Sequence, residues 1–312
     1  MQATSQIEAV HATASGGAAG RLRASGVGAL AVLLWAALAL FTTLSGHVPP
    51  FQLIALAFAI GGLIGLPRAL RGGRPTGGAS WRRLPAGAWV LGIGGLFGYH
   101  FCYFLALRHA PAVQAGLIAY LWPLLIVLFS ALLPGERLRW WHAAGALLGL
   151  GGTFLLVTGG QGVRFQGQFA LGYAAAGVCA VVWSAYSVAN RRYPEVPTDA
   201  VAFFCLATAG LAALCHLCFE HTVWPHGWQW LAVLALGLGP VGGAFYAWDH
   251  GTKHGDLRLL GTLSYFAPLL STALLVLAGR AAASWATAAA CALITGGALL
   301  ASTDALRAAR RR

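Results

Sequence analysis

Side chains that combine an apolar ring with a polar tip recur at helical spacing within the long apolar runs of this sequence. Tyr99 and Tyr103 are four residues apart, which places them on one helical face with His100 beside them, and Trp183 and Tyr186 share another face. Such rings can stack on an apolar side chain and attract an ammonium group, at about 0.5 to 2 kcal/mol for each contact. Hydroxyl and indole donors can bind a carboxylate. This chemistry suits a zwitterionic amino acid that is bound without covalent change.

The candidate binding residues share this polar and aromatic character and lie inside apolar runs. They are Trp35, Tyr99, His100, Tyr103, Tyr120, Trp122, Trp183, Tyr186, Tyr246, Trp248, Ser264 and Tyr265. Trp35, in Leu-Leu-Trp, is the counterpart of Trp183, in Val-Val-Trp. For any single ring the competing explanation is a membrane-interface belt or core packing, and this explanation is favoured for rings near the ends of the runs.

Three ionisable side chains in the apolar runs or close to their ends are also functional candidates, because a charge at the centre of a bilayer costs roughly 2.5 to 3.5 kcal/mol on insertion scales. His100 can hydrogen-bond a substrate or accept a proton, or it can be a neutral packing residue; the sequence does not say whether it titrates. Asp249 and Lys253 are four residues apart and are expected to form a local ion pair with a structural or gating function.

Neither metal nor cofactor chemistry is expected. Cys215, His216, Cys218, His221 and His226 gather near the outer end of one apolar run, but their spacing matches no common zinc pattern, and whether they bind a metal stays open. The other cysteines are single residues within apolar runs and are interpreted as free thiols. The sequence contains no HExxH or GxSxG motif, so catalytic residues are not expected and an intramembrane enzyme is a remote alternative.

The elements that position these residues must be membrane helices. The 312 residues are 58% hydrophobic and 9% charged, with a mean hydropathy of +0.71, which excludes an ordinary soluble domain. Apolar runs of about 20 residues predict an all-α, polytopic membrane protein with ten transmembrane helices. The predicted spans are 26–45, 48–67, 86–107, 112–132, 139–157, 168–190, 198–218, 228–250, 257–278 and 284–303.

The net charge of +12 follows the membrane topology and does not indicate nucleic-acid binding. If the N-terminus is cytoplasmic, every Lys and Arg except Arg108, Arg164 and Arg280 lies on the cytoplasmic side, as the positive-inside rule requires. The distribution predicts cytoplasmic termini in a bacterial inner membrane and attraction to anionic lipid headgroups. Residues 1–25 are expected to be a flexible cytoplasmic tail without a cleaved signal peptide, and residues 305–312 a basic cytoplasmic tail.

An internal repeat divides the chain into two halves of five predicted helices. Gly98, His109, Gly116, Tyr120 and Pro123 each recur 145 positions later, and the register is kept through Gly151 and Gly152. The first repeat is assigned to residues 26–160 and the second to residues 161–304. Because five is an odd number, the second copy must cross the bilayer upside down, and inverted repeats of this kind are typical of transporters.

The repeated Tyr-x-x-Pro motif predicts equivalent kinks in spans 112–132 and 257–278. Pro123 and Pro268 remove a backbone donor and displace the carbonyls of Ala119 and Ser264. In lipid such carbonyls need a neighbouring helix or a wet cavity as partner. The two prolines are therefore predicted hinge or gating positions, beside Asp249 and Lys253, and simple structural kinks are the alternative.

Three segments of the sequence resemble the drug/metabolite transporter superfamily. They are Gly116-Leu-Ile-Ala-Tyr-Leu-Trp-Pro123, Ala180-Val-Val-Trp-Ser-Ala-Tyr186, and Ala244-Phe-Tyr-Ala-Trp248 leading to Ser264-Tyr-Phe-Ala-Pro268. Within the superfamily they are most similar to the YddG-like aromatic amino acid exporters. The resemblance implies two five-helix EamA-type repeats, cytoplasmic termini, and export of amino acids through a cavity lined by the first, third, fourth, sixth, eighth and ninth spans.

These observations together predict a membrane transporter that exports aromatic and other neutral amino acids, or related metabolites, by alternating access. An exporter of another solute, such as a hydrophobic cation or a sugar derivative, is the main alternative. The pathway is complete within one chain, so the protein is expected to work as a monomer, although the sequence leaves its oligomeric state open. The sequence also leaves open the substrate range and whether transport is passive or proton-coupled.

Overall fold

The computed structural model describes residues 2–71, 84–279 and 284–304, and these residues form a bundle of long helices. Arg280 and the basic tail 305–312 lie outside the described residues. The first half of the chain contains α1 (Gln2–Ala36), α2 (Leu38–Leu44), α3 (Pro50–Arg71), α4 (Ala86–His109), α5 (Ala112–Ala119), α6 (Trp122–Ser130) and α7 (Trp140–Thr158). The second half contains α8 (Ala170–Ala189), α9 (Val201–Phe219), α10 (Gln229–Leu238), α11 (Ala244–His254), α12 (Leu257–Leu263), α13 (Phe266–Leu277) and α14 (Trp285–Ala301).

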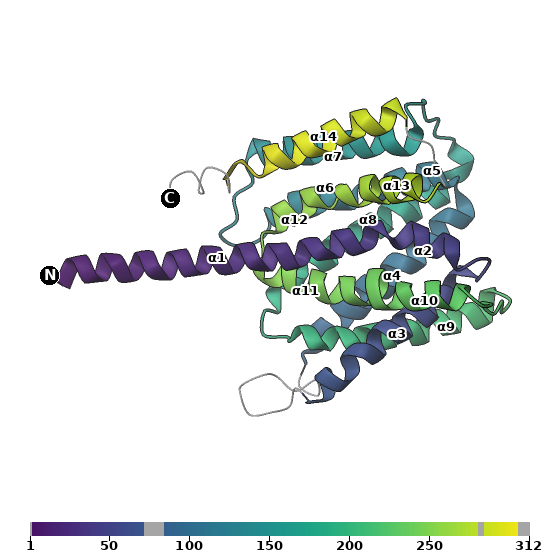
Figure 1. The fold of residues 1–312 in the computed structure, drawn as a ribbon, viewed down its shortest axis with the longest axis horizontal. Coiled ribbons are helices and arrows are strands. Elements are labelled where there is room, and N and C mark those ends of the chain that lie inside the picture. The colour runs from purple at the N-terminus through teal and green to yellow at the C-terminus, as the bar shows by residue number, and fades with distance from the viewer. Residues whose placement is uncertain (1, 72–83, 280–283, 305–312) are drawn as a thin grey trace.

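The ten predicted spans correspond to ten helical segments of the described chain. Nine segments are long and apolar enough to cross a membrane, and the tenth, Trp285–Ala301, is a shorter apolar helix. Several spans are built from two helices, such as α1 with α2 and α12 with α13. α1 begins and α14 ends on the same side of the bundle (Figure 1), as an even number of crossings requires.

Residues 2–25, which the sequence analysis assigned to an N-terminal tail, are helical in the structure. α1 begins at Gln2 and continues without interruption into the first membrane span, so that its first turns project beyond the bundle (Figure 1). The region is rich in alanine, which has the highest intrinsic helix propensity, and it contains no proline. These properties favour extension of the membrane helix toward the N-terminus.

The predicted kinks at Pro123 and Pro268 are confirmed as complete breaks. α5 ends at Ala119 and α6 begins at Trp122, while α12 ends at Leu263 and α13 begins at Phe266. The carbonyl of Ser264 is not left free, because it accepts a hydrogen bond from Ala267 N at 3.1 Å. A tight turn therefore replaces the helical bond that Pro268 cannot make.

A third interruption, which the sequence analysis missed, lies between α10 and α11. Residues Gly239–Gly243 form a π-helical turn that contains Pro240. A π-helical turn holds one residue more than an α-helical turn. Pro240 has no N–H to donate and the neighbouring glycines have no side chains, which allows this wider turn to form. The wide turn brings Gly242 against Gly61 of α3, where a Cβ atom on Gly61 would lie 2.7 Å from the Gly242 Cα.

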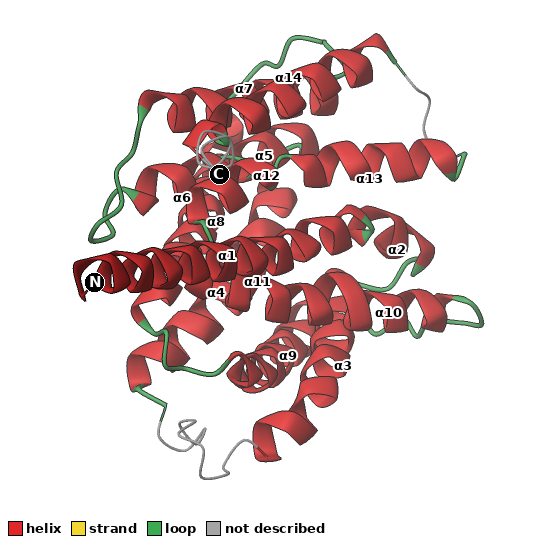
Figure 2. Cartoon of the chain, turned by 60° about the vertical axis from the view of Figure 1, so that its left-hand side comes forward, coloured by secondary structure: helices red, strands yellow, loops and turns green. Residues whose placement is uncertain are grey.

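The two halves of the chain are interlocked and do not form separate lobes. The most extensive helix contacts join α7 to α14, α3 to α9, α4 to α8 and α1 to α11, and each pair takes one helix from each half. In Figures 1 and 2, α7 and α14 form one edge of the bundle, α3 and α9 form the opposite edge, and α1, α4, α8 and α11 lie between them.

Glycines permit several of these contacts between the halves. A Cβ atom on Gly145 of α7 would lie 2.5 Å from the carbonyl oxygen of Gly297 of α14, and the reverse substitution meets the Gly145 oxygen at the same distance. Of the glycine pair in α14, only Gly297 faces α7, whereas a side chain on Gly296 would meet open space. The backbones therefore approach at positions where no other residue fits, which is a common form of helix packing in membranes.

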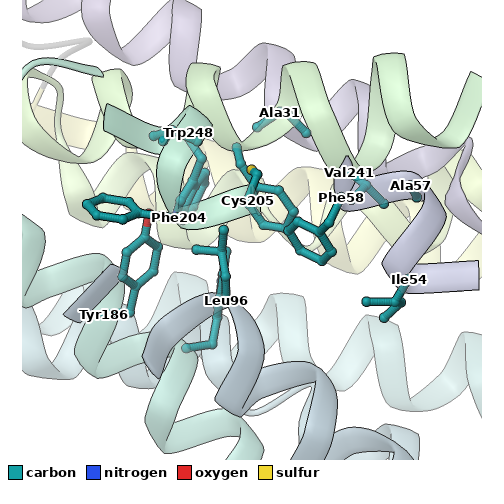
Figure 3. Close-up of a cluster of buried hydrophobic side chains, with 14 of the residues drawn as sticks. Ala31, Ile54, Ala57, Phe58, Leu96, Tyr186, Phe204, Cys205, Val241 and Trp248 are labelled. Carbon is teal, nitrogen blue, oxygen red and sulfur yellow. The ribbon is translucent and has the colours of Figure 1, made fainter. Parts of the chain in front are cut away.

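The main core lies between the edge helices and is strongly aromatic. Phe58, Trp248 and Tyr186 are fully buried, and Figure 3 shows them with Leu96 and Phe204 in one cluster. A smaller cluster of Val127, Ala146, Tyr265, Leu269 and Ile294 fills the space beside α7 and α14. The aromatic rings of the main core are therefore concentrated between the interlocked helices.

The glycine contact between α7 and α14 can be tested with a matched pair of substitutions. Gly297→Ala should lower the thermal unfolding temperature of the detergent-solubilised protein, because overpacking costs about 1–3 kcal/mol. Gly296→Ala should leave it unchanged or raise it slightly, since alanine is favoured over glycine in a helix by about 1 kcal/mol. Equal effects of the two substitutions would contradict the observed packing.

Candidate functional site

Four tryptophans from four helices meet at the centre of the site. Trp35 of α1, Trp122 of α6, Trp183 of α8 and Trp248 of α11 have every pair of ring centroids between 5.0 and 6.2 Å apart. Most of these pairs are edge-on, the arrangement that ring quadrupoles favour. We call these four residues the tryptophan cluster, and all four were predicted from the sequence.

Hydrogen bonds of two buried serines of α8 orient the tryptophan cluster. The indole N–H of Trp248 donates to Ser187 Oγ at 3.0 Å, and the Ser187 hydroxyl donates to the carbonyl oxygen of Trp183 at 2.8 Å. Ser184 Oγ lies 2.9 Å from the carbonyl oxygen of Trp122, beside the helix break before Pro123. Buried hydroxyls thus connect α8 to both α6 and α11, and neither serine was predicted.

The predicted residues of α4 lie next to the tryptophan cluster. The Tyr99 and Tyr103 rings stack with centroids 6.1 Å apart, and the Tyr99 ring lies 5.3 Å from that of Trp183. Both tyrosines are half-buried, as is Trp35, so these three side chains retain accessible surface. Tyr120, also half-buried, ends α5 at the helix break.

His100 packs edge-on against Phe58 of α3 at 5.2 Å between centroids. Its Nδ1 lies 2.7 Å from the Leu96 carbonyl oxygen, which can only accept, so Nδ1 carries the hydrogen. In the neutral ring Nε2 is then an acceptor. Phe245, which the sequence analysis missed, lies 145 positions after His100, and their rings are 6.3 Å apart. The repeat itself is the signal that could have identified Phe245.

Three predicted binding residues do not join the tryptophan cluster. The Tyr265 hydroxyl accepts a hydrogen bond from Leu124 N at 3.1 Å, and its ring packs in the smaller core against Gly149 of α7. The Tyr246 hydroxyl donates to the Gly61 carbonyl oxygen at 3.0 Å, beside α3. Ser264 bonds to the Leu260 carbonyl oxygen within its own helix. Tyrosine spacing alone cannot distinguish such packing contacts from a binding surface.

Tyr186 lies beside the tryptophan cluster but faces the core. Its ring centroid is 5.2 Å from that of Trp183, and a side chain on Gly95 of α4 would overlap its ring. The Tyr186 hydroxyl is buried and has no hydrogen-bond partner among the described residues. The Tyr186 ring therefore packs against both Trp183 and α4 and helps to hold Trp183 in place.

The predicted ion pair of Asp249 and Lys253 is confirmed, and it is buried. Lys253 Nζ lies 2.9 Å from Asp249 Oδ1 and donates to the Val196 carbonyl oxygen at 2.9 Å. Asn190 donates to Asp249 Oδ1 at 3.0 Å and Thr198 to Oδ2 at 2.7 Å. We call these five residues the buried strut; it ties α11 to the segment that joins α8 and α9.

Near the C-terminal end of α9, one member of the predicted cysteine and histidine group, His216, is engaged by other side chains. His216 Nδ1 lies 2.9 Å from Glu220 Oε2, and its Nε2 lies 2.9 Å from Thr222 Oγ1. Glu220 also accepts from the backbone N–H groups of Phe51 and Gln52 at the start of α3. Within the described residues no group of three or more His, Cys, Asp or Glu side chains could hold a metal ion.

Removal of one charge from the buried strut should be more damaging than removal of both. Lys253→Met leaves Asp249 buried without its partner, at a cost of about 3–5 kcal/mol. The double variant Asp249→Asn, Lys253→Met should recover much of that loss. Thermal unfolding in detergent measures the coupling, and strictly additive effects would show that the pair does not act as a unit.

The sequence matches a known family of transporters along most of its length. The profile of the EamA-like transporter family matches twice, at residues 23–158 and 170–303. The aromatic amino acid exporter YddG of Ancylobacter novellus is 60% identical over 290 residues, which cover 92% of this chain and 99% of the relative. The Escherichia coli protein of the same name is 26% identical, covering 90% of this chain and 97% of that protein.

A solved crystal structure superimposes with a TM-score of 0.86 at 60% sequence identity, covering 92% of this chain and 99% of the solved chain. The two profile matches coincide with two groups of five helical segments, and together they account for most of the sequence. A family of transporters also agrees with the absence of the HExxH and GxSxG motifs from the sequence. The chain is therefore a multi-pass membrane protein that belongs to the EamA-like transporter family.

Proposed function

We propose that this protein exports aromatic amino acids, and that the tryptophan cluster with Tyr99, Tyr103 and Tyr120 forms its substrate site. The observation that carries the proposal is the convergence of four tryptophans from α1, α6, α8 and α11 at centroid distances of 5.0 to 6.2 Å. The similarity to a relative named as an aromatic amino acid exporter, over nearly the whole of both chains, supports the same substrate class.

The groups available at this site suit a zwitterion with an aromatic side chain. Among the described residues, hydrogen bonds do not engage the indole N–H groups of Trp35, Trp122 and Trp183, so these donors are free for a carboxylate. The ring faces can attract an ammonium group, and His100 Nε2 is an acceptor close by. Asp249 is already paired with Lys253, so the substrate is recognised without a free counter-charge.

Transport by alternating access would use the helix breaks before Pro123 and Pro268 as hinges. Both breaks lie in the helices that join the smaller core at α7 and α14 to the rest of the bundle. Because the densest contacts join helices of different halves, the moving bodies would each contain helices from both repeats. This differs from simple rocking of one repeat against the other.

The proposed topology places both termini in the cytoplasm of a bacterial inner membrane. It rests on the distribution of Lys and Arg and on the start of α1 and the end of α14, which lie on one side of the bundle. Basic residues on that side would also contact anionic lipid headgroups. Since one chain supplies the whole tryptophan cluster, a monomer is sufficient for this function.

A second solute class deserves a direct test because aromatic faces also attract hydrophobic cations. The buried strut argues against such substrates, since the Asp249 carboxylate is neutralised by Lys253 and is not free to bind a cation. Efflux of labelled phenylalanine should therefore be inhibited by tyrosine and tryptophan, but not by a quaternary ammonium compound or a sugar. Inhibition only by the cation would replace the proposed substrate class.

Loss of a ring from the tryptophan cluster should weaken transport. Trp122→Ala and Trp183→Ala should raise the half-saturating phenylalanine concentration in proteoliposomes by roughly two- to thirtyfold, the range expected for one cation–π contact. Trp228→Ala is the matched control, because Trp228 is 84% exposed and lies outside the cluster. Gel filtration establishes that the variants remain folded, and unchanged flux in both cluster variants would exclude this site.

A pH gradient is not expected to drive accumulation. The Asp249 oxygens accept hydrogen bonds from Asn190, Thr198 and Lys253, so this buried carboxylate has a structural function in the bundle. Phenylalanine should therefore equilibrate across proteoliposome membranes at the same level with and without an imposed gradient. Accumulation only with the gradient would show coupling, and His100→Gln would then identify whether His100 carries the proton.

A further inference from the structure

Three arginines converge on one carboxylate at the end of the bundle where α14 ends. Glu136, in the loop between α6 and α7, accepts from Arg21 of α1 at 2.7 Å and from Arg191, after α8, at 3.0 Å. Arg258 of α12 lies 3.1 Å from the other carboxylate oxygen. We call Glu136 and these three arginines the glutamate latch. The sequence analysis counted the arginines only as part of the positive-inside distribution.

A second carboxylate extends the latch to the connection between α11 and α12. Asp256 caps α12 by accepting from Arg258 N and Leu259 N, and its carboxylate lies 3.5 Å from Arg258 Nε and 3.7 Å from Arg21 Nη2. Burial disfavours the ionised form, but the neighbouring Arg258 and Arg21 guanidinium groups and the Leu259 N–H outweigh this effect and lower the pKa of Asp256. Arg191 also donates to the Gly255 carbonyl oxygen.

The helices held by the latch are those that carry the tryptophan cluster. α1 carries Trp35 and Arg21, α6 carries Trp122 and leads to Glu136, α8 carries Trp183 and leads to Arg191, and α11 carries Trp248 and leads to Gly255. The paired positions are 7 to 14 residues apart in the sequence. At 1.5 Å per helical residue, the two levels are separated by roughly 10–20 Å. The four helices therefore approach one another twice, once at the tryptophan cluster and again at the latch.

The latch differs from the buried strut in the parts of the chain that it joins. Asn190, Val196, Thr198, Asp249 and Lys253 all lie in the second family match, 170–303, so the strut stabilises one half internally. Glu136 instead contacts Arg191 and Arg258 of the other half, and Arg21 lies 3.7 Å from Asp256 of that half. The side chains of the latch are 14–42% exposed, with Arg21 the most exposed, whereas the strut ion pair is 1% exposed. Partly exposed ion pairs are weak enough to break and reform.

We propose that the glutamate latch is a gate at the end of the bundle where α14 ends. During each transport cycle the ion pairs of the latch would break and reform, so that α1, α6, α8 and α11 separate and come together again at this end. This inference rests on the alternating access of the proposed function. In the closed arrangement seen here the latch holds the four helices together at this end. Its breakage would expose the inner side of the tryptophan cluster.

Hydrogen–deuterium exchange of the detergent-solubilised protein, without any substrate, tests the gate directly. Glu136→Gln removes the charge with little change of shape and should accelerate exchange in residues 17–31 and 255–263 roughly three- to fivefold, as expected for loss of a partly exposed ion-pair set. Arg191→Gln should do the same. The matched controls are Glu195→Gln and Arg192→Gln, since both residues are exposed and have no ion pair among the described residues.

Salt provides a second measurement that needs no variant. An increase of KCl from 0.1 to 1 M shortens the screening length to about 3 Å, so exchange of the same two segments should accelerate in the wild-type protein and remain unchanged in Glu136→Gln. If exchange is insensitive both to Glu136→Gln and to salt, the latch is not a gate. If the latch opens as expected but proteoliposomes do not transport phenylalanine, the gate stands and the proposed substrate is wrong.

Discussion

Close approach of helix backbones between the two halves of the chain is the constraint on which the rest of this structure depends. At Gly145 and Gly297 there is no space for a Cβ atom, and the same is true where Gly61 meets Gly242. Lipid chains are as apolar as leucine side chains, so helices in a membrane associate through packing and hydrogen bonds and gain little from hydrophobic burial between them. The glycines bring α7 against α14 and α3 against the π-helical turn. The two edges of the bundle are thereby fixed, and the aromatic helices between them are confined to a narrow space.

Within that space, the polar atoms determine which contacts are permanent. Ser184 and Ser187 are fully buried and use their hydroxyls to connect α8 with α6 and α11, where each unmade hydrogen bond is costly. The buried strut continues the same connection toward the end of the bundle. Glu136 lies where the side chains are partly exposed and the ion pairs are screened. A gradient from buried to exposed polar contacts therefore runs along α8, and it separates the fixed part of the bundle from the part that is free to move.

The ten spans, the repeat, the proline breaks and the four tryptophans were predictable because each leaves a local signal in the sequence. Apolar runs predict spans, Pro123 and Pro268 interrupt a helix wherever they occur, and ring residues at helical spacing share a face. The contacts of Tyr246 and Tyr265 were not predictable, because their hydroxyls bond to backbone atoms of distant helices. Glu136 was missed for a similar reason: its three partners lie 55 to 122 positions away in the sequence and meet only when the helices are assembled. The π-helical turn has Pro240 and neighbouring glycines as its signal, but nothing in their order distinguishes a wide turn from a kink.

The contact between His100 and Phe245 has an evolutionary consequence. These residues occupy the same position in the two copies and touch each other, so they lie at the axis that relates the copies. In an ancestor assembled from two identical subunits, any residue at this point would have faced its own replica. A solute with two chemically different ends would then have had two equivalent orientations. In the present chain histidine faces phenylalanine, and Trp122 corresponds to Ala267, so the two orientations are no longer equivalent.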